Sequence, residues 1–78
     1  MYKEVKSKLI KNILKCISKI EKGNGTLEDA KKIELMLFDL KTLPRTEKTY
    51  DEWFSTYLQI MHLEIRYASA LLRLSTKP

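Results

Sequence analysis

Residues that carry catalytic or metal chemistry are scarce in this 78-residue chain, which has one cysteine and one histidine. A lone cysteine, Cys16, forms no internal disulfide, which is typical of a reducing compartment. Zinc sites need several cysteines or histidines at paired spacings, so we expect no metal and no cofactor. We also expect no enzyme, because His62 has no nucleophile or orienting group at catalytic spacing on its helix face.

Long hydrophobic runs are missing as well. The longest stretch without a charge, Trp53 to Leu63, has 11 residues, whereas a membrane span needs about 20. Lysines interrupt the apolar residues near the N-terminus, which argues against a signal peptide. We therefore expect no membrane span and a cytoplasmic location. The excess of lysine over arginine, 12 to 3, indicates an AT-rich prokaryotic or viral genome.

Glycine and proline occur only twice each, and their places divide the chain into helices. The Gly-Asn-Gly sequence at 23–25 is a helix-stop and turn signal, because glycine accepts positive φ. Pro44 ends the second helical pattern, since the residue before a proline avoids the α conformation. We expect one helical domain over residues 1–78, with helices at about 2–22, 27–43 and 49–75.

Capping residues mark the starts of the second and third helices. Thr26 precedes Asp29 by three residues, which is the spacing of a capping box. Thr49 and Glu52 repeat that spacing. Acidic residues in a first helical turn also interact favourably with the helix dipole, so both pairs predict helix starts.

The first predicted helix is strongly amphipathic. At 100° per residue its apolar residues, Cys16 among them, lie on one side. Five lysines lie opposite, within an arc of roughly 80° and along about 21 Å. We call them the lysine ridge: Lys8, Lys11, Lys15, Lys19 and Lys22. The first 22 residues carry the whole net charge of +5, and charge gathered on one segment attracts acidic partners.

The third predicted helix carries two apolar stripes. The first comprises Tyr50, Phe54, Tyr57, Leu58, Met61, Ile65, Ala68 and Leu72. The second comprises Trp53, Ile60, Leu63, Tyr67, Ala70, Leu71 and Leu74. A chain this short forms a small core, and its two shorter helices leave part of the longest one uncovered. We expect an all-α antiparallel three-helix bundle that dimerises into a larger helical bundle, with Trp53, Ile60, Tyr67 and Leu74 at the dimer seam.

Three further residues are candidates for the dimer or partner interface. Leu35 and Phe38 point away from the main apolar stripe of the second helix. Glu64 lies on the apolar side of the third helix, where a carboxylate needs a partner. It is either a rim residue paired with a lysine or a tyrosine hydroxyl, or a group that fixes the dimer register.

These patterns favour a non-enzymatic interaction module: an adaptor, inhibitor or accessory subunit that binds another macromolecule. The lysine ridge would attract an acidic partner, and the surplus apolar surface would serve assembly. The alternative is a small nucleic-acid-binding protein that contacts phosphates with the same lysines. Such binding would be indifferent to sequence, since lysine offers no bidentate contact to bases. An interfacial role of the first helix on a membrane surface is a third hypothesis.

Overall fold

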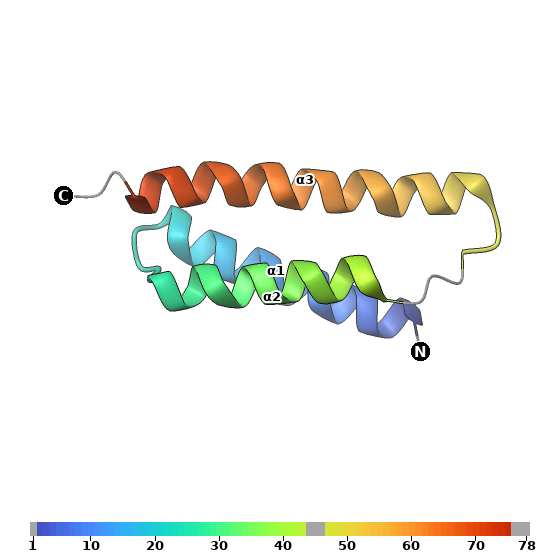
Figure 1. Ribbon diagram of the computed structural model, residues 1–78, viewed down its shortest axis with the longest axis horizontal. Coiled ribbons are helices and arrows are strands. Elements are labelled where there is room, and N and C mark those ends of the chain that lie inside the picture. The colour runs from blue at the N-terminus through green and yellow to red at the C-terminus, as the bar shows by residue number, and fades with distance from the viewer. Residues whose placement is uncertain (1, 44–46, 76–78) are drawn as a thin grey trace.

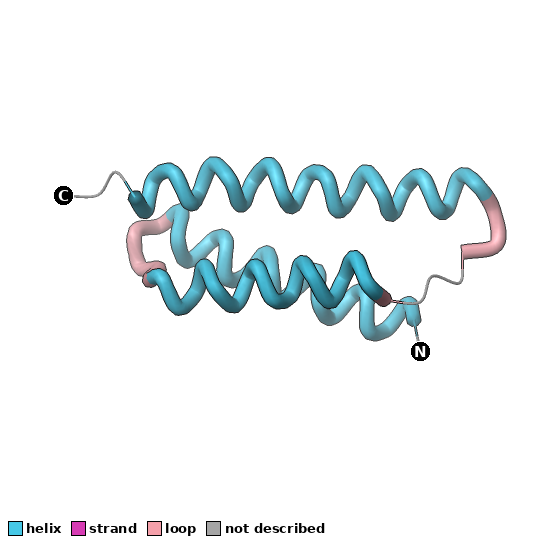
Figure 2. The backbone as a smooth tube through the Cα atoms, in the orientation of Figure 1, coloured by secondary structure: helices cyan, strands magenta, loops and turns pink. Residues whose placement is uncertain are grey.

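The computed structural model describes residues 2–43 and 47–75, which form three helices: α1 (Tyr2–Glu21), α2 (Leu27–Thr42) and α3 (Tyr50–Ser75). The chain runs up, down and up again, so α2 is antiparallel to both neighbours (Figure 1). All three helices pack against one another, and a short loop joins α1 to α2 (Figure 2). The predicted all-helical architecture is confirmed, and each helix ends within one residue of its expected position.

The glycine-containing turn ends α1. Gly23 has a φ of 86°, the left-handed conformation that glycine adopts without strain. The N–H of Asn24 donates to the carbonyl of Lys19, and the N–H of Gly23 donates to that of Ile20, both at 3.0 Å. These two bonds form a Schellman motif, which satisfies carbonyls that a helix end leaves unpaired.

Threonine caps begin the other two helices. The Thr26 hydroxyl accepts from the Asp29 N–H at 3.4 Å, and the Asp29 carboxylate accepts from the Thr26 N–H at 2.9 Å. At α3 the Thr49 hydroxyl accepts from the Glu52 N–H at 3.1 Å. The Glu52 carboxylate, one methylene longer than that of aspartate, accepts from the N–H of Lys48 at 3.4 Å. In this second capping box the carboxylate therefore accepts from the N–H of Lys48 and not, as the spacing predicts, from that of Thr49.

The end of α2 follows from the residue after it. Leu43 has a φ of −58° and a ψ of 135°, the extended conformation that a following proline imposes. The break predicted at Pro44 itself lies outside the described residues.

The core lies between the three helices and takes one stripe from each. Ile13 and Ile17 of α1 and Ile33 of α2 are fully enclosed. The remaining buried apolar residues are Ile20, Ala30, Leu37, Leu40, Ile60, Leu63, Tyr67 and Ala70. The second stripe of α3 is therefore the one that faces α1 and α2.

The bundle is elongated, with extents of 47 × 19 × 17 Å. Its length follows from α3, which has 26 residues against 20 in α1 and 16 in α2. At 1.5 Å per residue α3 exceeds α2 by about 15 Å. The first turns of α3 project beyond the ends of the other two helices (Figure 1), so α2 does not reach that part of α3.

Candidate interaction surfaces

The lysine ridge lies on the side of α1 that faces away from the core, and all five of its side chains are exposed. Within residues 2–43 and 47–75, no ion pair involves Lys8, Lys11, Lys15 or Lys22. Their charges are directed to solvent, where a partner can reach them.

Lys19 differs from the rest of the ridge. Its Nζ lies 3.4 Å from Oδ1 of Asp29, in the first turn of α2. The Asp29 residue is only 5% exposed. The hydrogen bond from the Thr26 N–H, together with the charge of Lys19, holds the pKa of Asp29 below its usual value against the effect of burial. Lys19 thus stabilises the α1–α2 contact, a role the sequence does not reveal because its partner lies on another helix.

The ridge lysines repel one another. Lys11, Lys15 and Lys19 follow at intervals of four residues, and Lys8 and Lys22 extend the row by steps of three. Residues at these spacings are neighbours on a helix surface, and each like-charge pair destabilises a helix by roughly 0.2–0.5 kcal/mol. An acidic partner that neutralises the ridge would relieve this repulsion.

The most extensive exposed apolar surface lies on α3. The first stripe of α3 faces solvent, and we call it the outer stripe: Tyr50, Phe54, Tyr57, Leu58, Met61, Ile65, Ala68 and Leu72. Tyr50 is 70% exposed, and Leu72, at the other end of the stripe, is 66% exposed. Contiguous apolar surfaces of this kind mark interaction sites on soluble proteins.

Four aromatic rings gather at the projecting start of α3. Trp53 and Tyr57 stack with ring centroids 5.7 Å apart. Tyr50 lies 6.0 Å from Trp53 and 5.9 Å from Phe54. The four residues remain between 41% and 70% exposed, so their contacts with one another remove only part of their surface from water. Aromatic residues concentrated on an exposed face are typical of a surface that a partner covers.

The predicted dimer seam does not coincide with this exposed surface. Ile60 and Tyr67 lie in the core of the chain itself, each 9% exposed, and Leu74 packs against that core. Of the four predicted seam residues, Trp53 alone is exposed. The second stripe faces inward because the Tyr67 hydroxyl finds acceptors on α2 and because Ala70 allows close helix approach.

A smaller apolar surface lies on α2. Leu35 and Phe38 are 66% and 64% exposed, as their positions away from the main stripe predict. Leu35 also lines a groove of about 350 Å³ between α1 and α2, whose other lining residues are Asn12, Lys15, Cys16, Lys32 and Met36. This groove therefore combines apolar side chains with two lysines, one of them from the ridge.

The Glu64 carboxylate forms an ion pair with Lys41 of α2. Both side chains are about half exposed, at 40% and 49%. A lysine is one of the two partners that the first interpretation of Glu64 predicts. It also means that Glu64 can border an interface without carrying an uncompensated charge into it.

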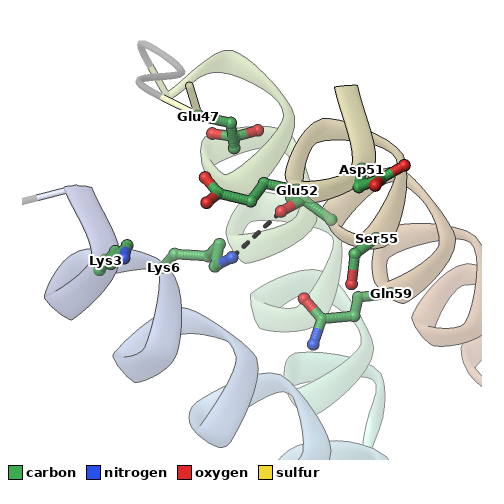
Figure 3. Close-up of a pocket in the computed structure, with 8 residues that line it drawn as sticks. Lys3, Lys6, Glu47, Asp51, Glu52, Ser55 and Gln59 are labelled. Carbon is green, nitrogen blue, oxygen red and sulfur yellow. Dashed lines mark hydrogen bonds between the residues drawn. The ribbon is translucent and has the colours of Figure 1, made fainter. Parts of the chain in front are cut away.

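A polar cavity of about 410 Å³ lies between the starts of α1 and α3 (Figure 3). Lys6 donates a 3.1 Å hydrogen bond to the hydroxyl of Thr56, which is only 3% exposed. Lysines and carboxylates both line the cavity: Lys3, Lys6, Glu47, Asp51 and Glu52. These opposite charges favour no ligand of a single sign, and Lys6 acts there as the donor that satisfies a buried hydroxyl.

The remaining candidate groups are dispersed. His62 is exposed on the polar side of α3, and Cys16 packs against the core as expected. In the part of the chain that the structure describes, no three histidine, cysteine or acidic residues cluster to hold a metal ion. None of the described helices is long and apolar enough to cross a membrane.

Comparison of the chain with protein-family models, curated proteins and solved structures finds no match. The lysine ridge supplies charge and the outer stripe supplies apolar area, on different helices.

Proposed function

We propose that the chain is a non-enzymatic helical interaction module, an adaptor, inhibitor or accessory subunit that acts in the cytoplasm. It pairs with a second copy of itself through α3 and binds an acidic macromolecule through the lysine ridge. The outer stripe carries this proposal, because neither α1 nor α2 covers it.

The surface area of the chain supports self-association. The accessible surface is 5794 Å², whereas a compact monomer of 9.2 kDa exposes roughly 4,900 Å². The radius of gyration is 13.4 Å, against about 11.5 Å for a compact chain of this length. The excess of roughly 900 Å² is close to the ~800 Å² that each partner buries in a stable complex.

An acidic protein segment is the partner that fits the ridge best. The groove between α1 and α2 places Lys15 and Lys32 beside the apolar side chains of Leu35 and Met36. An amphipathic acidic helix could lay its apolar side chains on that groove and direct its carboxylates to the lysines. A phosphate backbone would use the lysines alone.

Nucleic acid is the alternative partner, and the linear arrangement of the ridge favours it. Five lysines along about 21 Å of helix can follow successive phosphates, and a dimer would present two such ridges. Because lysine gives point charges, this binding would ignore base sequence and fall steeply with salt.

Anisotropy measurements with two labelled probes separate these partners. One probe is a glutamate-rich amphipathic peptide, and the other is mixed-sequence DNA or RNA, each at low and moderate salt. Lys11/Lys15→Glu reverses charge in the ridge and leaves the Lys19–Asp29 pair intact. Lys31/Lys48→Glu makes the same charge change elsewhere and serves as the matched control.

If the partner is an acidic protein, the peptide should bind to the unsubstituted chain and to the control variant, but not to the ridge variant. Leu35→Asp should then weaken peptide binding and spare nucleic acid. Preferential binding of DNA or RNA, unaffected by Leu35→Asp, would support the alternative. Absence of binding to either probe at low salt would overturn the role of the ridge, and a monomeric mass by light scattering at tens of micromolar would overturn self-association.

A further inference from the structure

We infer that two copies pair through their outer stripes with the α3 helices antiparallel and Met61 on the two-fold axis. This inference rests on the self-association proposed above and adds its geometry. The spacing of the stripe carries it, because apolar residues lie 4, 7 and 11 positions from Met61 in both directions. They are Tyr57, Phe54 and Tyr50 before Met61, and Ile65, Ala68 and Leu72 after it.

A two-fold axis at Met61 makes use of this symmetry. In an antiparallel pair, a residue before the axis meets the residue equally far beyond it in the second copy. The contacts of Tyr50 with Leu72, of Phe54 with Ala68 and of Tyr57 with Ile65 are then all apolar. The spacing averages about 3.7 residues per turn, close to the 3.6 of an α-helix, so the stripe stays on one face for about 33 Å.

The sizes of the side chains also favour the antiparallel arrangement. Phe54 would meet Ala68 of the second copy, and Tyr57 would meet Ile65, so that large residues lie opposite smaller ones. A parallel pair would place the aromatic residues against one another at one end and Ala68 against its own copy at the other. Close packing across the whole seam is therefore easier with antiparallel helices.

Charges at one edge of the stripe agree with this direction. Asp51 lies at the start of α3 and Arg73 near its end, on the same side of the outer stripe. The antiparallel pair brings Asp51 beside Arg73 of the second copy. Arg73 also donates a 3.2 Å bond to the backbone oxygen of Glu21 within its own chain. A parallel pair would instead gather the acidic starts of both α3 helices at one end and align the helix dipoles.

The opposite edge of the stripe borders α2. Glu64 lies there, on the other side of the stripe from Leu58 and Asp51. Lys41 already neutralises the Glu64 carboxylate. The seam can therefore close over this edge without burying an unpaired charge.

Thiol crosslinking tests the arrangement in the 78-residue chain carrying Cys16→Ala. Only variants whose circular dichroism shows that they remain helical are used. A short bis-maleimide is added to each of three variants: Met61→Cys, Tyr50→Cys and Leu72→Cys. The antiparallel pair predicts that Met61→Cys crosslinks to itself. Tyr50→Cys and Leu72→Cys should not crosslink alone, because each thiol lies about 33 Å from its copy, but the mixture of the two should.

The outcomes separate this inference from the broader proposal. A monomeric unsubstituted chain in light scattering overturns both. A dimer in which Tyr50→Cys crosslinks to itself overturns the antiparallel arrangement alone. Met61→Glu should abolish the dimer, and His62→Glu, its neighbour on the polar side of α3, should preserve it. If both variants stay dimeric, or both become monomeric with helical content intact, the outer stripe is not the seam.

Discussion

The hydroxyl of Tyr67 donates a 2.6 Å hydrogen bond to the carboxylate of Glu34 and so joins α3 to α2. The same hydroxyl lies 3.3 Å from the carbonyl oxygen of Ala30. Burial, followed by the hydrogen bond to Glu34 and the charge of that carboxylate, raises the pKa of Tyr67 to about 12. The fold therefore stabilises the neutral phenol.

Alkaline unfolding should report this contact. Because the folded pKa of Tyr67 exceeds the value of about 10 expected in the unfolded chain, its contribution is complete below pH ~10 and is lost as the pH rises through the folded pKa. Tyr67→Phe should lower the free energy of unfolding by about 1–2 kcal/mol at neutral pH and reduce this alkaline loss. Urea unfolding from neutral to alkaline pH measures both effects, with exposed Tyr50→Phe as the control. An unchanged pH dependence in Tyr67→Phe would contradict the assignment.

Acid unfolding should depend on the pair between Glu21 and Arg66. Arg66 donates through Nη2 at 2.8 Å and through Nε at 3.1 Å to the two carboxylate oxygens. These bonds lower the pKa of Glu21, against a smaller opposing effect of desolvation. Its stabilising contribution is thus present above pH 4.5, the ordinary value, and is lost as the pH falls through the lower folded pKa.

Glu21→Gln should therefore flatten the acid side of the stability profile, measured by urea midpoints across the acidic range. Arg66→Lys retains the charge but not the two-pronged bond, so it should show an intermediate profile. An acid limb identical in all three proteins would show that the pair does not contribute.

The α1–α2 turn should resist substitution for two different reasons. Gly23→Ala places a side chain at a φ of 86°, which costs about 1–2 kcal/mol, and Gly23→Asn should cost less because asparagine tolerates this region. A Cβ at Gly25 would lie 2.7 Å from the Cα of Ile20, a core residue that is 4% exposed. Because backbone must move, Gly25→Ala should lower the melting temperature more than Gly23→Ala. If Gly23→Ala lowers the melting temperature more than Gly25→Ala, the positive φ of Gly23 restricts the turn more than the contact of Gly25 with Ile20 does.

The helix ends could be predicted because their signals are local. The glycine turn after Glu21 and the caps at Thr26 and Thr49 act within a few residues of the chain. Such hydrogen bonds depend on residue type and spacing, which the sequence displays directly. Buried Thr56 gave no such signal, since its partner Lys6 is 50 residues away in the chain.

The orientation of α3 could not be predicted for the same physical reason. Its two stripes are similarly apolar, so periodicity does not choose between them. The choice depends on long-range contacts, such as the bond from Tyr67 to Glu34. Ile60 and Tyr67, predicted at the dimer seam, therefore lie in the core, and the exposed apolar surface of α3 is the outer stripe.

The lysine ridge should be less stable than a helix face of mixed charge. Lys15→Glu replaces two like-charge neighbours, with Lys11 and Lys19, by two attractive pairs, which should stabilise the fold by about 1 kcal/mol at low salt. Lys15→Gln removes the repulsion without adding attraction and should give roughly half that gain. Thermal unfolding at low and high salt measures the effect, and added salt should shrink it by screening. The stabilised Lys15→Glu protein should also bind the acidic peptide more weakly, because the same charges that strain α1 attract the partner. A variant that gains stability and keeps full binding would separate the two effects and exclude Lys15 from the binding surface.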